Sequence, residues 1–299
     1  MLAPPSDGEV NLSYLEIIDF KHGLFDSEAL RKKGLELQEA YRSADPFPHI
    51  AIDDFVSPEI LEMCLDQFPK ERDPDSKSFD RSQERYKTSY NPDYLTPEVR
   101  SFFYSLNSRP FIQFLENMSG VKGLIPDPYF LGGGFHETRT GGHLDVHADF
   151  NLHKPMNLER RLNLLIYLNK DWRLEYGGGL ELWDEKMASC VQEICPEFGR
   201  CVVFSTNDTS YHGHPKPVNH PLGASRRSIA LYYYTATWDE SSRSKTTQFK
   251  ARPGTKDEAD WKVKRNELIN EYLPPALSRH VFKAIRKIDR ASARNKSPR

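Results

Sequence analysis

The chain has 299 residues, of which 38% are hydrophobic, 28% charged and 12% aromatic, and its formal net charge is −2. This composition excludes a disordered chain, which would lack the aromatic residues, and a collagen-like chain, which would need far more glycine. No apolar run reaches the roughly 18–20 residues that a membrane helix requires, so we expect no membrane span.

The N-terminal third of the chain predicts helices around a single strand. Asp26 is a candidate N-cap for a helix-favouring stretch, so we expect residues 1–45 to form a helical segment. PFPHIAIDDF then alternates in the way that is typical of a strand. Ser57 and Thr96 each precede a Pro-Glu pair, a pattern that predicts a helix start. Between those helices, residues 70–93 are polar and interrupted by proline, which indicates a long loop and a candidate lid.

From about residue 129 the sequence changes to a series of short β-rich runs. These are YFLGGGFHET, GGHLDVHADF, RLNLLIYLN, GGLELW, GRCVVFS and RRSIALYYYT, and glycine- or proline-containing turns separate them. Several short strands with regular turn signals predict a β-sandwich or jelly roll rather than βαβ units. We therefore expect a mainly β domain with flanking helices over residues 46–240.

The last part of the chain is strongly basic. Residues 241–299 hold 16 Lys and Arg against 6 Asp and Glu, whereas the preceding 240 residues hold 25 against 37. We expect a basic helical C-terminal extension over 241–299, with an amphipathic helix around 277–292. Such a tail could contact an acidic partner, RNA or an anionic membrane surface, or it could lie against the acidic body of its own chain.

The cysteines and the start of the chain bear on location. Cys64, Cys190, Cys195 and Cys201 show neither a C-x-x-C pair nor a zinc-ribbon spacing. The first residues lack a basic region followed by an apolar stretch, so no signal peptide is predicted. We expect a reduced, cytoplasmic protein.

One predicted strand carries a candidate metal site. In GGHLDVHADF, His143, Asp145, His147 and Asp149 recur at period two, so on a regular strand they share one face. Either His143 with Asp145 or His147 with Asp149 could bind a metal ion, and His212, after the apolar strand CVVF, is placed to supply a third ligand. Two histidines and one carboxylate leave about three positions open on an octahedral ion, which suits non-haem Fe(II) chemistry. A zinc hydrolase can use the same ligand types.

A second motif points to a carboxylate. Arg226 and Ser228 lie on one face of the predicted strand RRSIALYYYT. A guanidinium that faces the inside of such an apolar strand needs an anionic partner, and together with a hydroxyl it suits a small carboxylate. A salt bridge to one of the domain's many acids is the alternative.

In this order the motifs resemble the Fe(II)/2-oxoglutarate-dependent dioxygenases, and within them the prolyl 4-hydroxylase-like branch. The resemblance covers about residues 46–237 and implies a double-stranded β-helix, or jelly-roll, core. The opening PFPHIAIDDFVSPEI is also similar to the start of that branch's catalytic domain. The motifs that carry the resemblance are His147-x-Asp149, IYLNKDW, GGGLELW, His212 and Arg226-x-Ser228.

The resemblance implies a role for each matching residue. His147, Asp149 and His212 match the iron ligands, and they are therefore the implied catalytic residues. Gly141-Gly142 matches a glycine pair that precedes the first ligand, which favours His147 over His143. Arg226 matches the basic residue that pairs with the far carboxylate of 2-oxoglutarate, and Ser228 and Tyr167 match its hydroxyl partners.

The sequence departs from the family pattern in three places. His214 is a second candidate for the last ligand, although the spacing from the preceding strand favours His212. Thr138 stands where many prolyl hydroxylases carry a tyrosine. The gap between His212 and Arg226 is longer than in the hypoxia-type enzymes, which implies an inserted turn over residues 215–224.

The resemblance also implies an activity. The chain is expected to use Fe(II), 2-oxoglutarate and O2, with ascorbate as an accessory reductant, and to hydroxylate an unactivated C–H bond with release of succinate and CO2. A prolyl residue of a protein or peptide is the favoured substrate, and a free amino acid or other small metabolite is the alternative. A zinc hydrolase and a non-catalytic jelly-roll binding module are less favoured.

Overall fold

The computed structural model describes residues 13–236, 248–249 and 254–255, and single residues at 265, 269, 277, 281 and 285. The chain divides into two units, Met1–Glu258 and Ala259–Arg299. Most of the basic extension 241–299, including most of the helix expected around 277–292, lies outside the described residues. In the part of the chain that is described, no helix is long and apolar enough to cross a membrane.

The first unit contains every helix and strand that has printed bounds. The helices are α1 (Ser27–Glu36), α2 (Gln38–Arg42), α3 (Pro58–Asp66), α4 (Pro97–Leu106) and α5 (Arg109–Ser119). The strands are β1 (Ile17–Asp19), β2 (Leu24–Phe25), β3 (His49–Ile52), β4 (Lys77–Arg81), β5 (Glu84–Tyr90), β6 (Ile125–Pro126), β7 (Gly134–Ala148), β8 (Leu152–His153), β9 (Leu158–Tyr167), β10 (Leu180–Trp183), β11 (Cys190–Ile194), β12 (Cys201–Ser205), β13 (His212–His214), β14 (Arg226–Ala236) and β15 (Gln248–Phe249).

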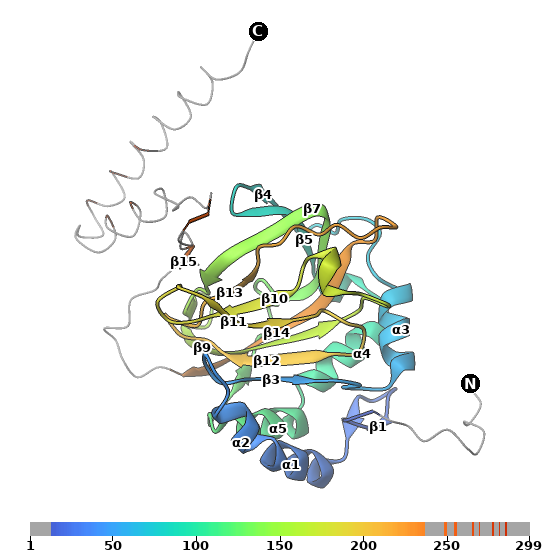
Figure 1. Cartoon of the computed structure of the whole chain (residues 1–299). Helices are drawn as coiled ribbons and strands as arrows, with labels where there is room; N and C mark the ends of the chain where they lie inside the picture. Colours follow the sequence, from blue (N-terminus) through green and yellow to red (C-terminus); the bar gives the residue numbers. More distant parts are fainter. Residues whose placement is uncertain are drawn as a thin grey trace. The chain divides into compact units, whose positions relative to one another are not determined.

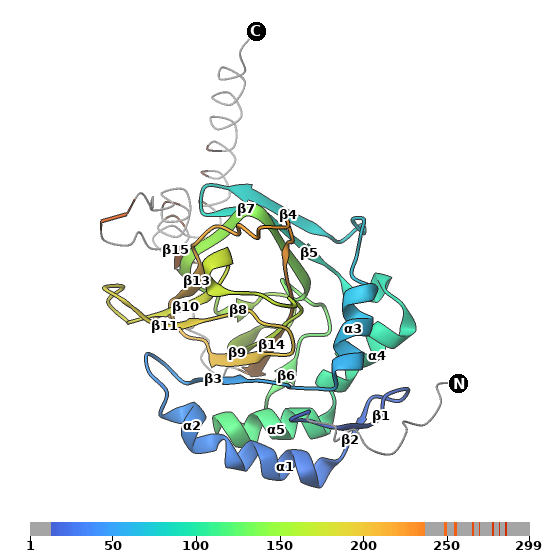
Figure 2. The same cartoon turned by 45° about the vertical axis from the view of Figure 1, so that its right-hand side comes forward.

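An antiparallel sheet curls into a barrel-like core (Figures 1 and 2). Counted over the described residues, this sheet has 13 strands, and its main path runs β11-β10-β13-β7-β14-β9-β12-β3. The remaining five strands pair with members of this path or with one another, and β15 lies beside the end of β7. The expectation of a mainly β fold with a double-stranded β-helix core is confirmed.

Strand β7 belongs to both sides of the barrel. Its first residues, as far as Thr138, pair with β14, whereas its last residues, from Leu144, pair with β13. The transition occurs at Gly141 and Gly142. Gly141 has φ +78°, which favours glycine, and a Cβ on Gly142 would lie 2.6 Å from the carbonyl oxygen of Arg85. The strand therefore carries side chains from one wall of the barrel to the other.

The helices cover one side of the sheet, where α1 and α5 lie side by side (Figure 2). They are as close as their backbones allow, because a Cβ on Gly34 of α1 would lie 2.5 Å from the carbonyl oxygen of Phe114. Leu30 of α1 and Phe111 of α5 belong to the same buried cluster as Leu164 of β9. The described N-terminal residues thus share the core of the barrel, and a small β1–β2 sheet precedes the two helices predicted there.

Residues 70–93 differ from the loop expected from their sequence. They contain the β4–β5 hairpin, and β5 extends the sheet by pairing with β7. The loop prediction is wrong because the hairpin has few apolar side chains. Its buried positions include Glu84 and Thr88, and polar side chains that face a polar barrel interior give no apolar alternation.

Candidate metal and carboxylate site

Three side chains converge at one end of the barrel. His147 lies near the end of β7, Asp149 follows that strand, and His212 opens β13, directly opposite His147 in the ladder. The Nε2 atom of His147 lies 3.5 Å from Asp149 Oδ1, and that of His212 lies 3.4 Å from Asp149 Oδ2. All three candidate ligand atoms lie within 4.8 Å of one another, and no other such group occurs among the described residues.

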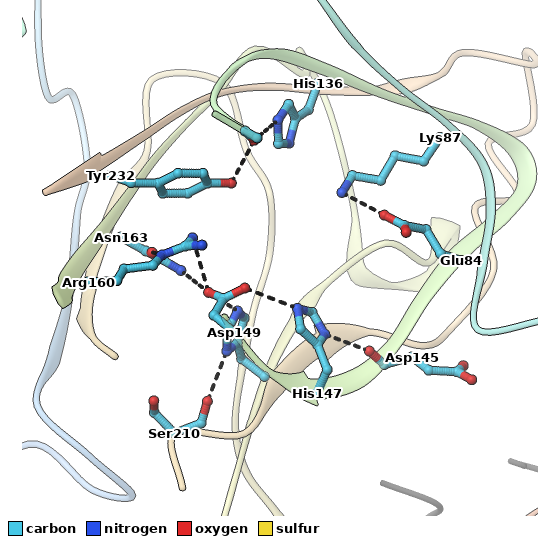
Figure 3. A network of polar contacts seen from close by, with 12 residues as sticks. Glu84, Lys87, His136, Asp145, His147, Asp149, Arg160, Asn163, Ser210 and Tyr232 are labelled. Carbon is cyan, nitrogen blue, oxygen red and sulfur yellow. Dashed lines mark hydrogen bonds and ion pairs between the residues drawn. The ribbon is translucent and has the colours of Figure 1, made fainter. Parts of the chain in front are cut away.

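Backbone carbonyls orient both imidazole rings. The Nδ1 atom of His147 donates to the carbonyl oxygen of Asp145 at 2.8 Å, and that of His212 donates to the carbonyl oxygen of Ser210 at 3.0 Å (Figure 3). Because a carbonyl oxygen can only accept, each Nδ1 carries the proton, and each Nε2 keeps its lone pair. Burial lowers the pKa of His147, which favours the neutral ring that binds a metal ion.

The carboxylate of Asp149 is held from the other side by β9. Its Oδ2 atom accepts from Asn163 Nδ2 at 2.7 Å and lies 3.1 Å from Arg160 Nη2. Burial by itself raises the pKa of Asp149, but the charge of Arg160, with smaller contributions from His212 and His147, holds that pKa well below its usual range. The group is therefore ionised, and Oδ1 is the oxygen with no short hydrogen bond.

The other His-x-Asp pair on β7 is not part of this cluster. His143 donates from Nε2 to the carbonyl oxygen of Ser82 at 3.1 Å, and neither it nor Asp145 lines the cavity that contains the cluster. The expectation that all four side chains share one face is wrong. Two residues of β13, from His212 to His214, span three residues of β7, and this bulge reverses the alternation.

Arg226 lines the same cavity as the three candidate ligands. It is 5% exposed, its Nε donates to the carbonyl oxygen of Gly178 at 2.7 Å, and its guanidinium carbon lies 5.0 Å from the centre of the Tyr167 ring. No acidic side chain pairs with it among the described residues, so the salt-bridge alternative does not hold there. Burial lowers the pKa of Arg226, as expected for a cation without a counter-ion.

The hydroxyl groups expected near Arg226 are also in place. Ser228 lines the cavity, and it pairs with Tyr167 across β14 and β9. The Tyr167 hydroxyl is buried and has no hydrogen-bond partner. An orphaned hydroxyl beside an unpaired guanidinium fits a carboxylate ligand, because such a ligand would satisfy both groups.

The inserted turn over residues 215–224 covers the Arg226 end of the cavity. Val218 is fully buried, donates to the carbonyl oxygen of Gly142 at 2.9 Å and accepts from the Gly141 N–H at 2.7 Å. Gly178 lies against the insertion and Arg226, since a Cβ there would lie 2.8 Å from Arg226 Cδ. The insertion is thus joined to the same glycines at which β7 changes sides.

Several cavity residues could not be found from the sequence. Arg160 and Asn163 lie on β9 at a spacing that a regular strand would place on opposite faces, but a bulge at Arg161 brings them together. Lys87 lines the cavity from β5, pairs with Glu84 at 3.0 Å and lies across the ladder from Thr138. Its segment was expected to be a loop. His214 is buried and lines the cavity, but it is outside the metal cluster.

Comparison with known proteins gave a family match for the site-bearing region. Residues 133–234 match the model of the 2OG-Fe(II) oxygenase superfamily. No curated protein matches the sequence significantly.

Similar solved structures include a Trichoplax adhaerens prolyl hydroxylase in complex with a hypoxia-inducible-factor peptide fragment (18% identity, 71% of this chain and 94% of that chain, TM-score 0.49). Others are a Pseudomonas putida prolyl-4-hydroxylase (14%, 68% and 98%, 0.47) and HygX from Streptomyces hygroscopicus with nickel, 2-oxoglutarate and hygromycin B bound (11%, 70% and 89%, 0.47).

Proposed function

Residues 133–234 form a 2OG-Fe(II) oxygenase domain, which makes the chain a 2-oxoglutarate-dependent dioxygenase, and we propose that it hydroxylates a prolyl residue of a protein or peptide. We also propose that it belongs to the prolyl 4-hydroxylase-like branch. The observation that carries this proposal is the convergence of His147, Asp149 and His212 in one cavity with an unpaired Arg226.

The residues present fit the family's metal and co-substrate. His147, Asp149 and His212 would hold Fe(II) through two neutral imidazoles and one carboxylate, a donor set that suits this ion. Once bound, Fe(II) and 2-oxoglutarate supply the oxidising chemistry that converts C–H to C–OH, with release of succinate and CO2. The protein's own contribution is to orient the three ligands and to keep the cavity walls fixed.

Arg226 would bind the far carboxylate of 2-oxoglutarate. Its Nη atoms have no printed hydrogen bond, and a guanidinium can donate two parallel hydrogen bonds to a carboxylate. The Tyr167 hydroxyl would add a third donor, and Ser228 a fourth. Thr138 is too short to replace a tyrosine, and Lys87 lies across the ladder from it.

The charges around the cavity favour a substrate without an ammonium group. Asp149 is the one acidic residue among the described residues that line the cavity, and Arg160 already pairs with it. Glu84, beside the cavity, pairs with Lys87 and Arg81. A free amino acid would bring in an ammonium group with no acidic partner, whereas the nitrogen of a peptide-bonded proline is neutral.

An anaerobic titration with Fe(II) and 2-oxoglutarate tests the activity, because their chelate gives a visible charge-transfer band. We expect the wild-type protein to form the band and His147→Ala to lose it, and we expect succinate release in air. Oxygen-independent activity with zinc would favour a hydrolase. Failure to bind any metal ion would favour a non-catalytic binding module.

Matched probes test the substrate class. Succinate release is compared for free L-proline, N-acetyl-L-proline and a peptide with a central proline, each against the substrate-free rate. We expect the two acylated compounds to stimulate release and free L-proline to have no effect. Stimulation by free L-proline alone would contradict the charge argument and favour the metabolite alternative.

We further propose that the basic extension, residues 241–299, contacts an acidic partner or RNA outside the catalytic domain. Its excess of Lys and Arg supports this proposal. Deletion of residues 275–299 should leave Fe(II) binding intact, and loss of folding would instead make this segment part of the core. A cytoplasmic location is also proposed, and the four cysteines, all free, agree with a reducing compartment.

A further inference from the structure

Asp149 can offer a metal ion either one carboxylate oxygen or both, and the contacts from β9 decide between these modes. We propose that Arg160 and Asn163 act as positioning residues that restrict Asp149 to one-oxygen coordination and so keep the position needed by 2-oxoglutarate open. This inference rests on the proposed function, because it concerns the same metal site.

The three side chains form a closed set of hydrogen bonds (Figure 3). Asn163 Nδ2 donates to Asp149 Oδ2 at 2.7 Å, Arg160 Nη2 lies 3.1 Å from the same oxygen, and Arg160 Nε donates to Asn163 Oδ1 at 2.9 Å. Both ends of the Asn163 amide are therefore used, which fixes its orientation. With two donors on Oδ2, Oδ1 is the oxygen left for a metal ion.

Packing holds the guanidinium of Arg160 in this place. The side chain is 3% exposed, and its guanidinium carbon lies 3.6 Å from the centre of the Tyr232 ring and 4.5 Å from that of Phe150. The Tyr232 hydroxyl donates to the carbonyl oxygen of Gly132 at 2.9 Å, so the ring is fixed as well. A guanidinium held against two rings cannot turn away from Asp149 without losing these contacts.

The number of coordination positions gives this geometry its consequence. Two imidazoles and one carboxylate oxygen occupy three of the six positions of an octahedral ion. 2-Oxoglutarate needs two of the others, and the reaction with oxygen needs the last. If Asp149 chelated the ion, one of these positions would be lost. Release of Oδ2 should therefore weaken 2-oxoglutarate binding more than it weakens metal binding.

Four variants test this inference. Arg160→Gln removes the fork of donors, Arg160→Lys keeps the charge without the fork, and Asn163→Ala removes the second donor. Arg161→Gln is the matched control, because its side chain is 39% exposed and its ion-pair partner is Glu159. Each purified protein is titrated anaerobically with Fe(II) and then with 2-oxoglutarate. The absorption of the Co(II)-substituted protein reports the number of ligands without any turnover.

We expect Arg160→Gln to weaken 2-oxoglutarate binding about tenfold or more, as loss of a charged hydrogen bond predicts, and to change Fe(II) binding by no more than about threefold. Asn163→Ala should act in the same direction, Arg160→Lys less, and the control not at all. The Co(II) spectrum should change in Arg160→Gln alone of the two arginine-to-glutamine variants.

Two results would overturn the inference: unchanged 2-oxoglutarate affinity in Arg160→Gln, or equal loss of Fe(II) and 2-oxoglutarate affinity, which indicates a purely structural role. If Arg160→Gln does not fold, Arg160→Lys and Asn163→Ala decide the question by the same ratio. Failure of the proposed function is distinguishable, because the wild-type protein itself would then form no charge-transfer band.

Discussion

Replacement of Arg226 by methionine should separate stability from co-substrate binding. The guanidinium is buried, its one hydrogen-bond partner is the Gly178 carbonyl, and no acidic group pairs with it among the described residues. Loss of that bond costs about 1–3 kcal/mol. Removal of an uncompensated buried charge returns several kcal/mol. We therefore expect the ligand-free variant to equal the wild type or to exceed its free energy of unfolding by about 1–3 kcal/mol.

Binding of 2-oxoglutarate should change in the opposite direction. Charged hydrogen bonds contribute about 1.5–3 kcal/mol each, so loss of one or two of them predicts roughly 10- to 1,000-fold weaker binding. The variant would thus be stable without ligand and almost insensitive to it.

Thermal unfolding with Mn(II), with and without 2-oxoglutarate, measures both quantities. A change of 1 kcal/mol corresponds to about 2–4 °C in Tm for a protein somewhat smaller than this one. Arg227→Met is the matched control, because Arg227 is the next residue on β14 and pairs with Glu137 at 3.4 Å. A ligand-free Arg226→Met protein that is less stable by more than about 2 kcal/mol would refute the reasoning, because the arginine would then hold the fold together. An unchanged ligand-induced shift would refute the assigned binding role.

Three further predictions concern other parts of the cavity. His147→Ala should weaken Fe(II) binding about 100-fold or more, measured by anaerobic titration, and near-normal affinity would remove this residue from the ligand set. Burial, reinforced by Lys87, holds the pKa of His136 well below 6.5. The unfolded chain therefore binds more protons just below pH 6.5, and the free energy of unfolding should rise with pH there, by at most about 1.4 kcal/mol per pH unit, and level off above it. Urea unfolding of His136→Gln should show a flatter pH profile, and an unchanged slope would exclude this residue as its source. Gly178→Ala should lower both stability and 2-oxoglutarate affinity, since its φ is +71° and its Cβ would lie 2.8 Å from Arg226 Cδ, and wild-type values for both would contradict this packing.

The sequence predicted the β-rich core well, because its strands combine turn residues with apolar alternation. It also singled out His147, Asp149 and His212, whose convergence depends on residues about 60 positions apart. The sequence alone left the choice between two His-x-Asp pairs open, since the bulge in β7 that separates them depends on its pairing with β13. No local pattern marks such a bulge.

The residues around Asp149 were missed for the same physical reason. Arg160 and Asn163 are on one side of β9 because of a second bulge, which is specified by the register against β14. The β4–β5 hairpin was missed because its side chains face a polar interior. Alternation of apolar residues reports burial in an apolar core, and it says little about a strand that lines a polar cavity.

The insertion over residues 215–224 has a kinetic consequence. Because Val218 and its neighbours cover the Arg226 end, 2-oxoglutarate has to pass the metal ligands to reach that arginine. A substrate already seated over the metal ion would block this route. Turnover should therefore be compulsorily ordered, with the co-substrate loading first, and excess substrate should act as an inhibitor that competes with 2-oxoglutarate.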